Sequence, residues 1–166
     1  MTLTLQQATP GDLPRIRDLA HRIWRAHYPA IIGSKQVDYM LGSMYSLESL
    51  QRQMEAEGQM FRLVMDGEEV IGYLSVSHRG EGQYFLHKFY LDNEQRGRGL
   101  GKKVFGLLLS HYPGIRELRL TVNRQNYKSI NFYFKIGFTI EHCVDIPIGE
   151  GFEMNDFQML YTTNQT

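Results

Sequence analysis

Three glycines at alternate positions, Gly97, Gly99 and Gly101, lie in a basic segment that ends at Lys102. Glycine adopts the tight backbone conformations that turn successive N–H groups toward one anion, and the start of a helix adds positive potential there. The apolar residues that follow recur on one face of a helix: Leu100, Val104, Leu107 and Leu108. The segment therefore predicts a cradle for a pyrophosphate.

Three other interpretations of this segment can be weighed on its residues. A flexible loop with arginines for solubility is the alternative when the segment is taken alone. A P-loop requires Ser or Thr after Gly-Lys, whereas Lys103 follows Gly101 and Lys102. A dinucleotide-binding fingerprint requires a different glycine spacing within a first βαβ unit. Neither of these two phosphate-binding motifs fits the sequence.

A second segment with functional residue types follows the β-rich stretch Leu118–Val122. In order, it contains Asn123, Asn126, Ser129, Phe132, Tyr133, Gly137 and Phe138. The alternative interpretation is structural: the aromatic residues, Phe134 included, are the core face of a helix, Asn126 is an ordinary N-cap and Ser129 an exposed helix residue.

Together the two segments resemble the GCN5-related N-acetyltransferase (GNAT) family. Arg96, Gly99 and Gly101 occupy the positions of its acetyl-CoA signature. The resemblance implies acetyl-CoA as co-substrate, no metal, Leu91 N–H as oxyanion donor and Tyr133 as the acid that protonates the coenzyme A sulfur. The cofactor-binding residues that it implies are Phe89, Tyr90, Leu91, Arg96, Gly97, Arg98, Gly99, Leu100, Gly101, Lys102, Asn123, Asn126 and Ser129.

The general base is not assigned by the sequence. His87 lies in the stretch before the cradle, and the ordinary pKa of histidine suits proton acceptance near neutrality. A packed or solvent-facing histidine without a role is the alternative. Asp92 and Glu94 are further candidates, although carboxylates just before a helix often serve as caps.

Acceptor recognition is expected from the N-terminal helical region and the loop near residues 148–152. Trp24 and Tyr28 are one helical turn apart, and Tyr45 can add to the same wall, with Met40 and Met44 beside it. These residues can instead pack the helices onto the sheet. The region resembles the bacterial polyamine acetyltransferase branch, which implies carboxylates for a polyamine: Asp38, Glu48, Glu150 and Glu153 are available.

The helices expected before the cradle follow from caps and apolar spacing. Asp12 can cap a helix with an apolar face at Ile16, Leu19, Ala20, Ile23 and Trp24. Ser34 and Ser46 can start two shorter helices that end before Gly58.

Strands are expected on either side of turn residues. Residues 61–65 and 70–76 flank Asp66-Gly67, and residues 80–82 form the next turn into 84–91. Two more strands, near 138–144 and 153–161, enclose a bend formed by Pro147, Gly149 and Gly151. The resemblance implies an α+β fold: a mixed, mostly antiparallel sheet of six or seven strands, about four helices and a splayed central strand pair.

Composition indicates one globular domain over residues 1–166. A hydrophobic content of 42% supports a core without metals or disulfides, and the single cysteine excludes an internal disulfide. Because 18 basic residues balance 18 acidic ones, we expect no nucleic-acid partner. The N-terminus shows neither a secretory signal nor a membrane span, which favours a cytoplasmic protein without membrane contact.

The sequence thus predicts an enzyme that moves an acetyl group from acetyl-CoA to a primary amine of a small molecule by direct attack in a ternary complex. Cys143 is expected to be a small buried residue rather than a nucleophile. A regulatory module that binds acetyl-CoA without turnover and a protein or peptide N-acetyltransferase are the alternatives. The C-terminal strands offer an edge for homodimer formation.

Overall fold

The computed structural model describes residues 2–92 and 99–163. The helices are η1 (Pro10–Asp12, 3₁₀), α1 (Leu13–His27), α2 (Pro29–Ile32), α3 (Ser34–Met44), α4 (Leu47–Glu55), α5 (Leu100–His111) and α6 (Tyr127–Ile136). The strands are β1 (Leu3–Gln7), β2 (Met60–Asp66), β3 (Glu69–Gly80), β4 (Gln83–Leu91), β5 (Glu117–Asn123), β6 (Thr139–Gly149) and β7 (Phe152–Thr162). The α+β class and the mostly antiparallel sheet predicted from the sequence are confirmed.

Hydrogen bonding joins the strands in the order β1-β2-β3-β4-β5-β7-β6. The pairs β1–β2, β2–β3, β5–β7 and β6–β7 are antiparallel. The pair β4–β5 is parallel and joins Gln83–Phe85 to Glu117–Arg119, the first residues of both strands. The chain divides into two compact units: residues up to 77 with 87–113, and residues 78–86 with 114 onward. A single domain over residues 1–166 stays a prediction.

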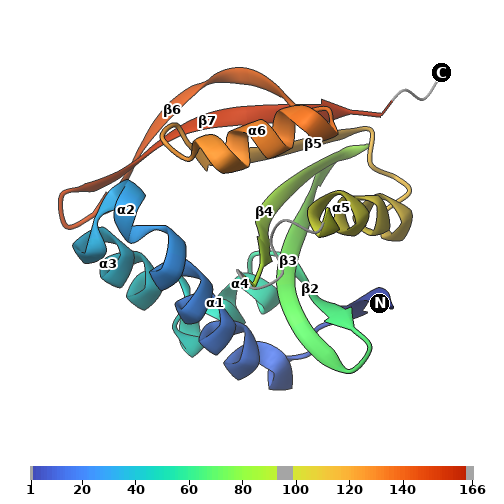
Figure 1. Ribbon diagram of the computed structural model, residues 1–166, viewed down its shortest axis with the longest axis horizontal. Coiled ribbons are helices and arrows are strands. Elements are labelled where there is room, and N and C mark those ends of the chain that lie inside the picture. The colour runs from blue at the N-terminus through green and yellow to red at the C-terminus, as the bar shows by residue number, and fades with distance from the viewer. Residues whose placement is uncertain (1, 93–98, 164–166) are drawn as a thin grey trace. The chain divides into compact units, whose positions relative to one another are not determined.

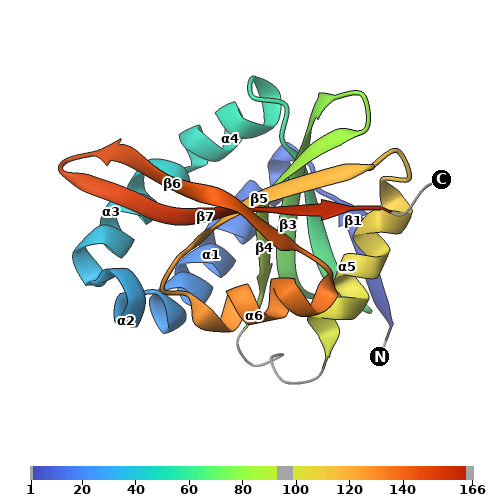
Figure 2. The same ribbon diagram turned by 90° about the horizontal axis from the view of Figure 1, so that it is seen from above.

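In the first unit, helices cover both faces of the strands. Figures 1 and 2 show α1–α4 together on one face of β1–β4 and α5 on the other. The predicted apolar face of α1 is confirmed, because all five of its residues are buried: Ile16, Leu19, Ala20, Ile23 and Trp24. On α5, three of the four predicted apolar residues, Leu100, Val104 and Leu108, are buried, and Leu107 is half-buried. The side chains of Lys102 and Lys103 are exposed, as the spacing predicts.

The caps of these helices agree in part with the sequence. Ser46 caps α4, since its hydroxyl accepts a hydrogen bond from the Ser49 N–H at 3.1 Å. Asp12 occupies the N-cap position of α1, but its carboxylate makes no capping bond to that helix. It accepts instead from the Thr9 N–H and hydroxyl, at 2.9 and 3.2 Å. The capping role predicted for Asp12 in α1 is therefore wrong, because the preceding 3₁₀ turn brings Thr9 closer to it.

Two short elements were not expected from the sequence. β1 has only Leu5 buried, and it is ordered by pairing with β2. α2 is a four-residue helix that starts at Pro29, a favoured first helical residue. The Asp66-Gly67 hairpin is confirmed, with Asp66 paired to Glu69 and Gly67 in the left-handed region.

The second unit is built on a long twisted hairpin of β6 and β7, with α6 beside β5 and β7 (Figure 1). Leu118, Leu120 and Val122 alternate as buried residues of β5, and Met159 of β7 is fully buried. Gly149 pairs with Phe152, so the turn consists of Glu150 and Gly151, both with positive φ. Pro147 was expected in the bend but lies within β6 at a register irregularity, which tolerates its missing N–H.

Among the described residues, no helix is long and apolar enough to cross a membrane.

Candidate functional site

The carboxyl end of β4 is held very close to β3. A Cβ placed on Gly72 of β3 would lie 2.4 Å from the carbonyl oxygen of Tyr90 and 2.8 Å from Cδ2 of Leu91. Just beyond Leu91, the Asp92 N–H donates to the Ile71 carbonyl at 2.8 Å, and the Asp92 carboxylate forms an ion pair with Arg22. Only glycine, which has no side chain, leaves room for this approach, so the distance between β3 and the backbone of the predicted oxyanion residue Leu91 depends on Gly72.

Part of the predicted cradle lies outside the described residues: Arg96, Gly97 and Arg98, together with the candidate base Glu94. Gly99 is the N-cap of α5 with φ of 69°, a left-handed conformation that suits glycine. As a glycine it has no side chain that could cap the helix, and the first turn of α5 has no acidic residue. Leu100 anchors the helix in the core. The described part of the cradle thus fits an anion, since the N–H groups of a first helical turn and the helix dipole favour negative charge.

Five aromatic residues of the first unit, Trp24, Tyr28, Tyr45, Tyr73 and Tyr90, form one aromatic cluster. The Trp24 ring centroid lies 4.6 Å from that of Tyr28, 5.4 Å from that of Tyr45 and 5.8 Å from that of Tyr90. Tyr73 continues the cluster at 6.0 Å from Tyr45 and 5.3 Å from Tyr90. The structure therefore brings the three predicted acceptor residues together with Tyr90, the predicted cofactor residue of β4.

The cluster has a buried side and a half-buried edge. Trp24, Tyr45 and Tyr73 are at most 5% exposed, so packing accounts for their position. Tyr28 and Tyr90 are half-buried, and their hydroxyl oxygens are 3.5 Å apart. The Tyr73 hydroxyl donates to the Tyr45 hydroxyl at 2.9 Å. Burial raises the pKa of both phenols well above its ordinary value. Tyr73 raises the pKa of Tyr45 further, whereas the hydrogen bond between them lowers the pKa of Tyr73.

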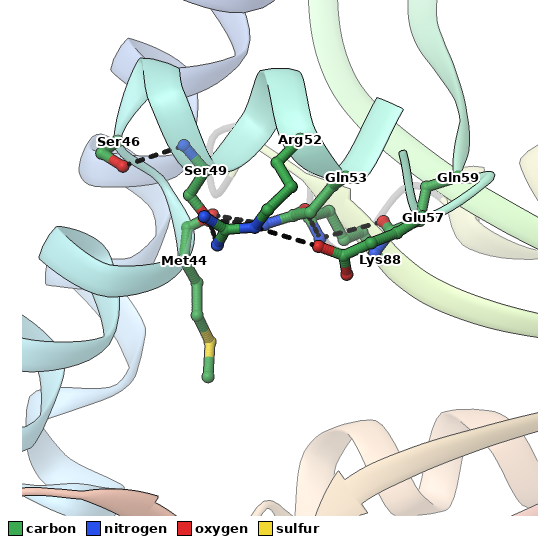
Figure 3. Close-up of polar contacts among 8 residues, drawn as sticks. All are labelled: Met44, Ser46, Ser49, Arg52, Gln53, Glu57, Gln59 and Lys88. Carbon is green, nitrogen blue, oxygen red and sulfur yellow. Dashed lines mark hydrogen bonds and ion pairs between the residues drawn. The ribbon is translucent and has the colours of Figure 1, made fainter. Parts of the chain in front are cut away.

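A buried lysine of β4 was not singled out in the sequence. The Lys88 ammonium donates to Oε1 of Gln53 at 2.7 Å and to Oε1 of Gln59 at 3.2 Å, and it lies 5.4 Å from the ring centroids of Tyr45 and Phe61. Figure 3 shows this lysine beneath α4, linked through Gln53 to Ser49 and Met44. Burial lowers the pKa of Lys88 to about 8, partly offset by Glu57. The signal available in the sequence was a basic residue two positions after Leu86, on the face of β4 that the alternation places inside.

His87, the candidate base on β4, points to a different partner from Lys88. Its Nε2 atom is 2.7 Å from the hydroxyl of Ser77, and its side chain is half-buried. The packed-histidine alternative left open by the sequence describes this environment well. A role for His87 in proton transfer stays a prediction.

In the second unit, the predicted cofactor-binding asparagines shape the start of α6. Oδ1 of Asn123 accepts from the Gln125 N–H at 2.8 Å, and Oδ1 of the buried Asn126 accepts from the Ser129 N–H at 3.4 Å. Asn126 is thus the N-cap of α6, as the structural alternative proposed. Their role toward acetyl-CoA stays a prediction.

Tyr133 lies at the middle of α6 in a half-buried position. Its ring centroid is 5.5 Å from that of Phe132 and 5.4 Å from that of Phe138, which follows the helix end at Gly137. The Phe138 N–H donates to the Tyr133 carbonyl at 2.9 Å and closes the helix. Phe134 is 46% exposed, so the interpretation of this aromatic run as a core face is wrong for that residue.

A buried carboxylate of β7, Asp156, was also missed. It is 5% exposed and lies opposite Asn123 in the β5–β7 register. Burial raises its pKa to about 6, while a hydrogen bond from Thr121 and the charge of Arg124 act in the opposite direction. The sequence of β7 gives no sign that Asp156 is buried, because the same strand also carries Glu153, which is exposed.

The carboxylates expected for a polyamine are on the surface. Asp38 is exposed and forms an ion pair with Arg25 at 2.6 Å, and Glu48, Glu150 and Glu153 are exposed. Cys143 is exposed as well, so the expectation of a buried cysteine is wrong. The reason is its position on β6, whose residues are exposed or only half-buried. Within the described ranges, no group of three His, Cys, Asp or Glu side chains is arranged to hold a metal.

Comparisons with known proteins agree with this fold. The model of the acetyltransferase (GNAT) family matches residues 16–138. The chain is 24% identical over 150 residues to a spermidine N(1)-acetyltransferase from Thermoplasma acidophilum, with 85% of this chain and 91% of that protein covered. It is 31% identical over 94 residues to the peptidyl-lysine N-acetyltransferase YjaB from Escherichia coli, covering 57% of this chain and 58% of that protein.

Among solved structures, the chain is similar to the PaiA N-acetyltransferase from Thermoplasma acidophilum in complex with coenzyme A. The TM-score is 0.78 at 24% identity, and the match covers 98% of this chain and 100% of that chain. This similarity concerns the fold.

Proposed function

This chain belongs to the acetyltransferase (GNAT) family and is an acetyl-CoA-dependent N-acetyltransferase, and we propose that its acceptor is a primary amine of a small, polyamine-like molecule. Acetyl-CoA is the co-substrate. The transfer is a direct attack of the amine on the thioester in a ternary complex, without a covalent enzyme intermediate. The carbon–nitrogen bond forms as the carbon–sulfur bond breaks.

The aromatic cluster is the observation that carries this proposal. Tyr28 and Tyr90 form its half-buried edge, and Tyr90 immediately precedes Leu91 on β4. Aromatic faces attract ammonium groups and also pack against methylene chains, the two components of a polyamine. Behind this edge, the buried Trp24, Tyr45 and Tyr73 hold the two rings in place. A rigid aromatic wall of this kind suits a small flexible amine.

The cofactor and catalytic roles are assigned on the same basis. N–H groups of the cradle and the first turn of α5 bind the pyrophosphate, and the Leu91 N–H stabilises the oxyanion that develops on the thioester oxygen. The Tyr133 hydroxyl donates a proton to the departing sulfur. Support for Leu91 comes from Gly72, whose lack of a side chain lets that backbone lie close against β3.

Initial rates of coenzyme A release from acetyl-CoA test the acceptor class. The panel contains spermidine, spermine, diamines, amino acids, aminoglycosides and a lysine peptide. We expect the polyamines to give the highest kcat/KM. Tyr28→Ala is expected to raise KM for the polyamine and leave KM for acetyl-CoA unchanged, whereas the matched variant Tyr127→Ala, at a site 68% exposed on α6, changes neither.

Peptidyl-lysine is the second candidate acceptor. The peptidyl-lysine N-acetyltransferase YjaB is 31% identical to this chain over 94 residues, whereas the spermidine N(1)-acetyltransferase is 24% identical over 150 residues. A higher kcat/KM for the lysine peptide than for any polyamine would favour it and contradict the primary proposal.

Two further features stay predictions with tests of their own. A homodimer would use β6, the last strand in the hydrogen-bonding order, on which Ile140 and Ile146 are 42% and 40% exposed. Light scattering tests it. Cell fractionation tests the cytoplasmic location.

A further inference from the structure

The proposed function gives no role to Lys88, although its ammonium lies in the core of the first unit. Lys88 and the two glutamines that accept its hydrogen bonds, Gln53 and Gln59, are at most 8% exposed. Both partners are neutral amides. Glu57 raises the pKa of Lys88 by its charge, but its ion pair is with Arg52, at 3.2 Å. A buried ammonium held by neutral amides costs folding free energy, which directs attention to what its hydrogen bonds position.

Gln53 provides the first link from Lys88 to the aromatic cluster. Its Oε1 accepts from Lys88 at 2.7 Å, while its Nε2 donates to the Met44 carbonyl at 2.8 Å (Figure 3). The same Nε2 donates to the Ser49 hydroxyl at 3.1 Å. Met44 is the last residue of α3, and Tyr45 follows it as the C-cap. Because Lys88 fixes which end of the amide faces β4, it also fixes the N–H group that holds the backbone next to Tyr45.

The second link is a direct contact between Lys88 and the Tyr45 ring. The ammonium nitrogen lies 5.4 Å from the ring centroid, and attraction between a cation and an aromatic face is strongest where water is excluded. Tyr45 is 2% exposed, meets the Trp24 ring edge-on at 5.4 Å and accepts a hydrogen bond from the Tyr73 hydroxyl at 2.9 Å. Lys88 thus restrains Tyr45 both at its ring and, through Gln53, at the adjoining backbone.

Trp24 extends this restraint to the half-buried edge of the cluster. Its ring centroid is 4.6 Å from that of Tyr28 and 5.8 Å from that of Tyr90. Nε1 of Trp24 lowers the pKa of the Tyr45 and Tyr73 phenols, but among the described residues it has no partner at hydrogen-bonding geometry. Ring contacts therefore hold the indole in place, and Tyr45 supplies one of them.

We propose that Lys88 is a positioning residue for the acceptor site. Its ammonium fixes the Tyr45 ring against Trp24, and Trp24 in turn orients the edge of the cluster that contacts the polyamine. This inference rests on the proposed function. Lys88 touches neither substrate, so its loss should weaken acceptor binding and leave acetyl-CoA binding and the transfer step unchanged.

Steady-state kinetics of Lys88→Met at pH 7 tests this role. Methionine keeps an unbranched, flexible side chain but removes the charge and the hydrogen bonds. KM for spermidine should rise about tenfold, as is typical for residues of one network. KM for acetyl-CoA and kcat should stay within about twofold, since a positioning effect on acceptor binding alone changes one KM. The control is Lys135→Met, at an exposed position on α6, which should change none of these values.

Gln53→Met tests the amide link and keeps the proposal testable if Lys88→Met does not fold. It should also raise KM for spermidine. The double variant should show the larger of the two single effects rather than their product, because both side chains belong to one hydrogen-bonded network. Gln51→Met, at an exposed position on the same helix, is the matched control and should behave as the wild type.

Fluorescence of Trp24, the single tryptophan of the chain, gives a readout that does not require turnover. Acrylamide should quench this buried indole more strongly in Lys88→Met and Gln53→Met than in the wild type and the two controls. Quenching or KM for spermidine that stays at the wild-type value in either folded variant would overturn the proposal. An equal rise in KM for acetyl-CoA would overturn it too. A wild-type protein that acetylates no amine would instead refute the proposed function, while the Trp24 signal would still test the link from Lys88 to the cluster.

Discussion

Gly72 and Tyr90 approach so closely that a single methyl group would not fit between them: a Cβ on Gly72 would lie 2.4 Å from the Tyr90 carbonyl oxygen. The contact involves backbone, which cannot rotate away as a flexible side chain would. The position of β4 at Tyr90 and Leu91 therefore depends on the absence of a side chain from β3.

Gly72→Ala is predicted to push the end of β4 away from β3. We expect a loss of about 2 kcal/mol in the free energy of unfolding and a fall in kcat that can reach about 100-fold, because the oxyanion donor is displaced. Urea unfolding and coenzyme A release measure the two effects. The control is Gly106→Ala on the exposed side of α5, where a Cβ meets nothing within 4 Å. That variant should gain about 0.5–1 kcal/mol and keep full activity. Normal turnover in Gly72→Ala would show that this approach does not position the reacting groups.

Lys88 is predicted to make stability depend on pH. Its pKa is about 8 in the folded protein against an ordinary value of 10.5, so the unfolded state binds more protons between these values. Stability should therefore rise with pH, by about 2 kcal/mol between pH 7.5 and 9.5. Below pH 7.5 the cost of the buried charge is fully present.

Urea unfolding across this pH range separates Lys88 from other groups. Lys88→Met should lose the rise, whereas Lys103→Met, at an exposed position on α5, should keep it. Parallel curves for the wild type and Lys88→Met would mean that the buried ammonium does not titrate in this range.

Tyr133→Phe is predicted to slow acetyl transfer about 100-fold, while calorimetry shows coenzyme A affinity largely unchanged. The ring contacts with Phe132 and Phe138 do not involve the hydroxyl, so the fold should be retained. Tyr127→Phe on the same helix is the matched control. Equal turnover in Tyr133→Phe and the wild type would remove the hydroxyl from the mechanism. It would also reopen the interpretation of this protein as a binding module.

Cys143 is predicted to be dispensable although it is exposed on β6. Alkylation with iodoacetamide should label this single thiol without loss of turnover, and Cys143→Ala should match the wild type. Inactivation by alkylation that Cys143→Ala resists would contradict direct transfer without a covalent intermediate.

Periodic patterns predicted the elements that are stabilised locally or have one apolar face. The apolar face of α1, the Ser46 cap and the Asp66-Gly67 turn are set by neighbouring residues, and the structure confirms them. β1 could not be predicted in the same way, since its order comes from pairing with β2, about 60 residues further along the chain.

The site residues divide in the same way, into those that neighbouring residues in the sequence predict and those that depend on distant parts of the chain. Glycine spacing and the Asn123–Phe138 pattern drew attention to the right elements, but burial of single charged residues depends on what surrounds them in space. Lys88 is surrounded by α4 and two aromatic rings, and Asp156 by β5 and β6. Neither environment can be derived from the residues next to it in sequence. For the same reason, Cys143 was expected inside and is found on the surface.

A competition experiment tests the acceptor class most directly. The protein is incubated with acetyl-CoA and equal concentrations of spermidine and a lysine peptide, and the products are followed by mass spectrometry. The account predicts that acetylspermidine accumulates first, in step with coenzyme A release. Preferential acetylation of the peptide, or coenzyme A release without any acetylated amine, would contradict it.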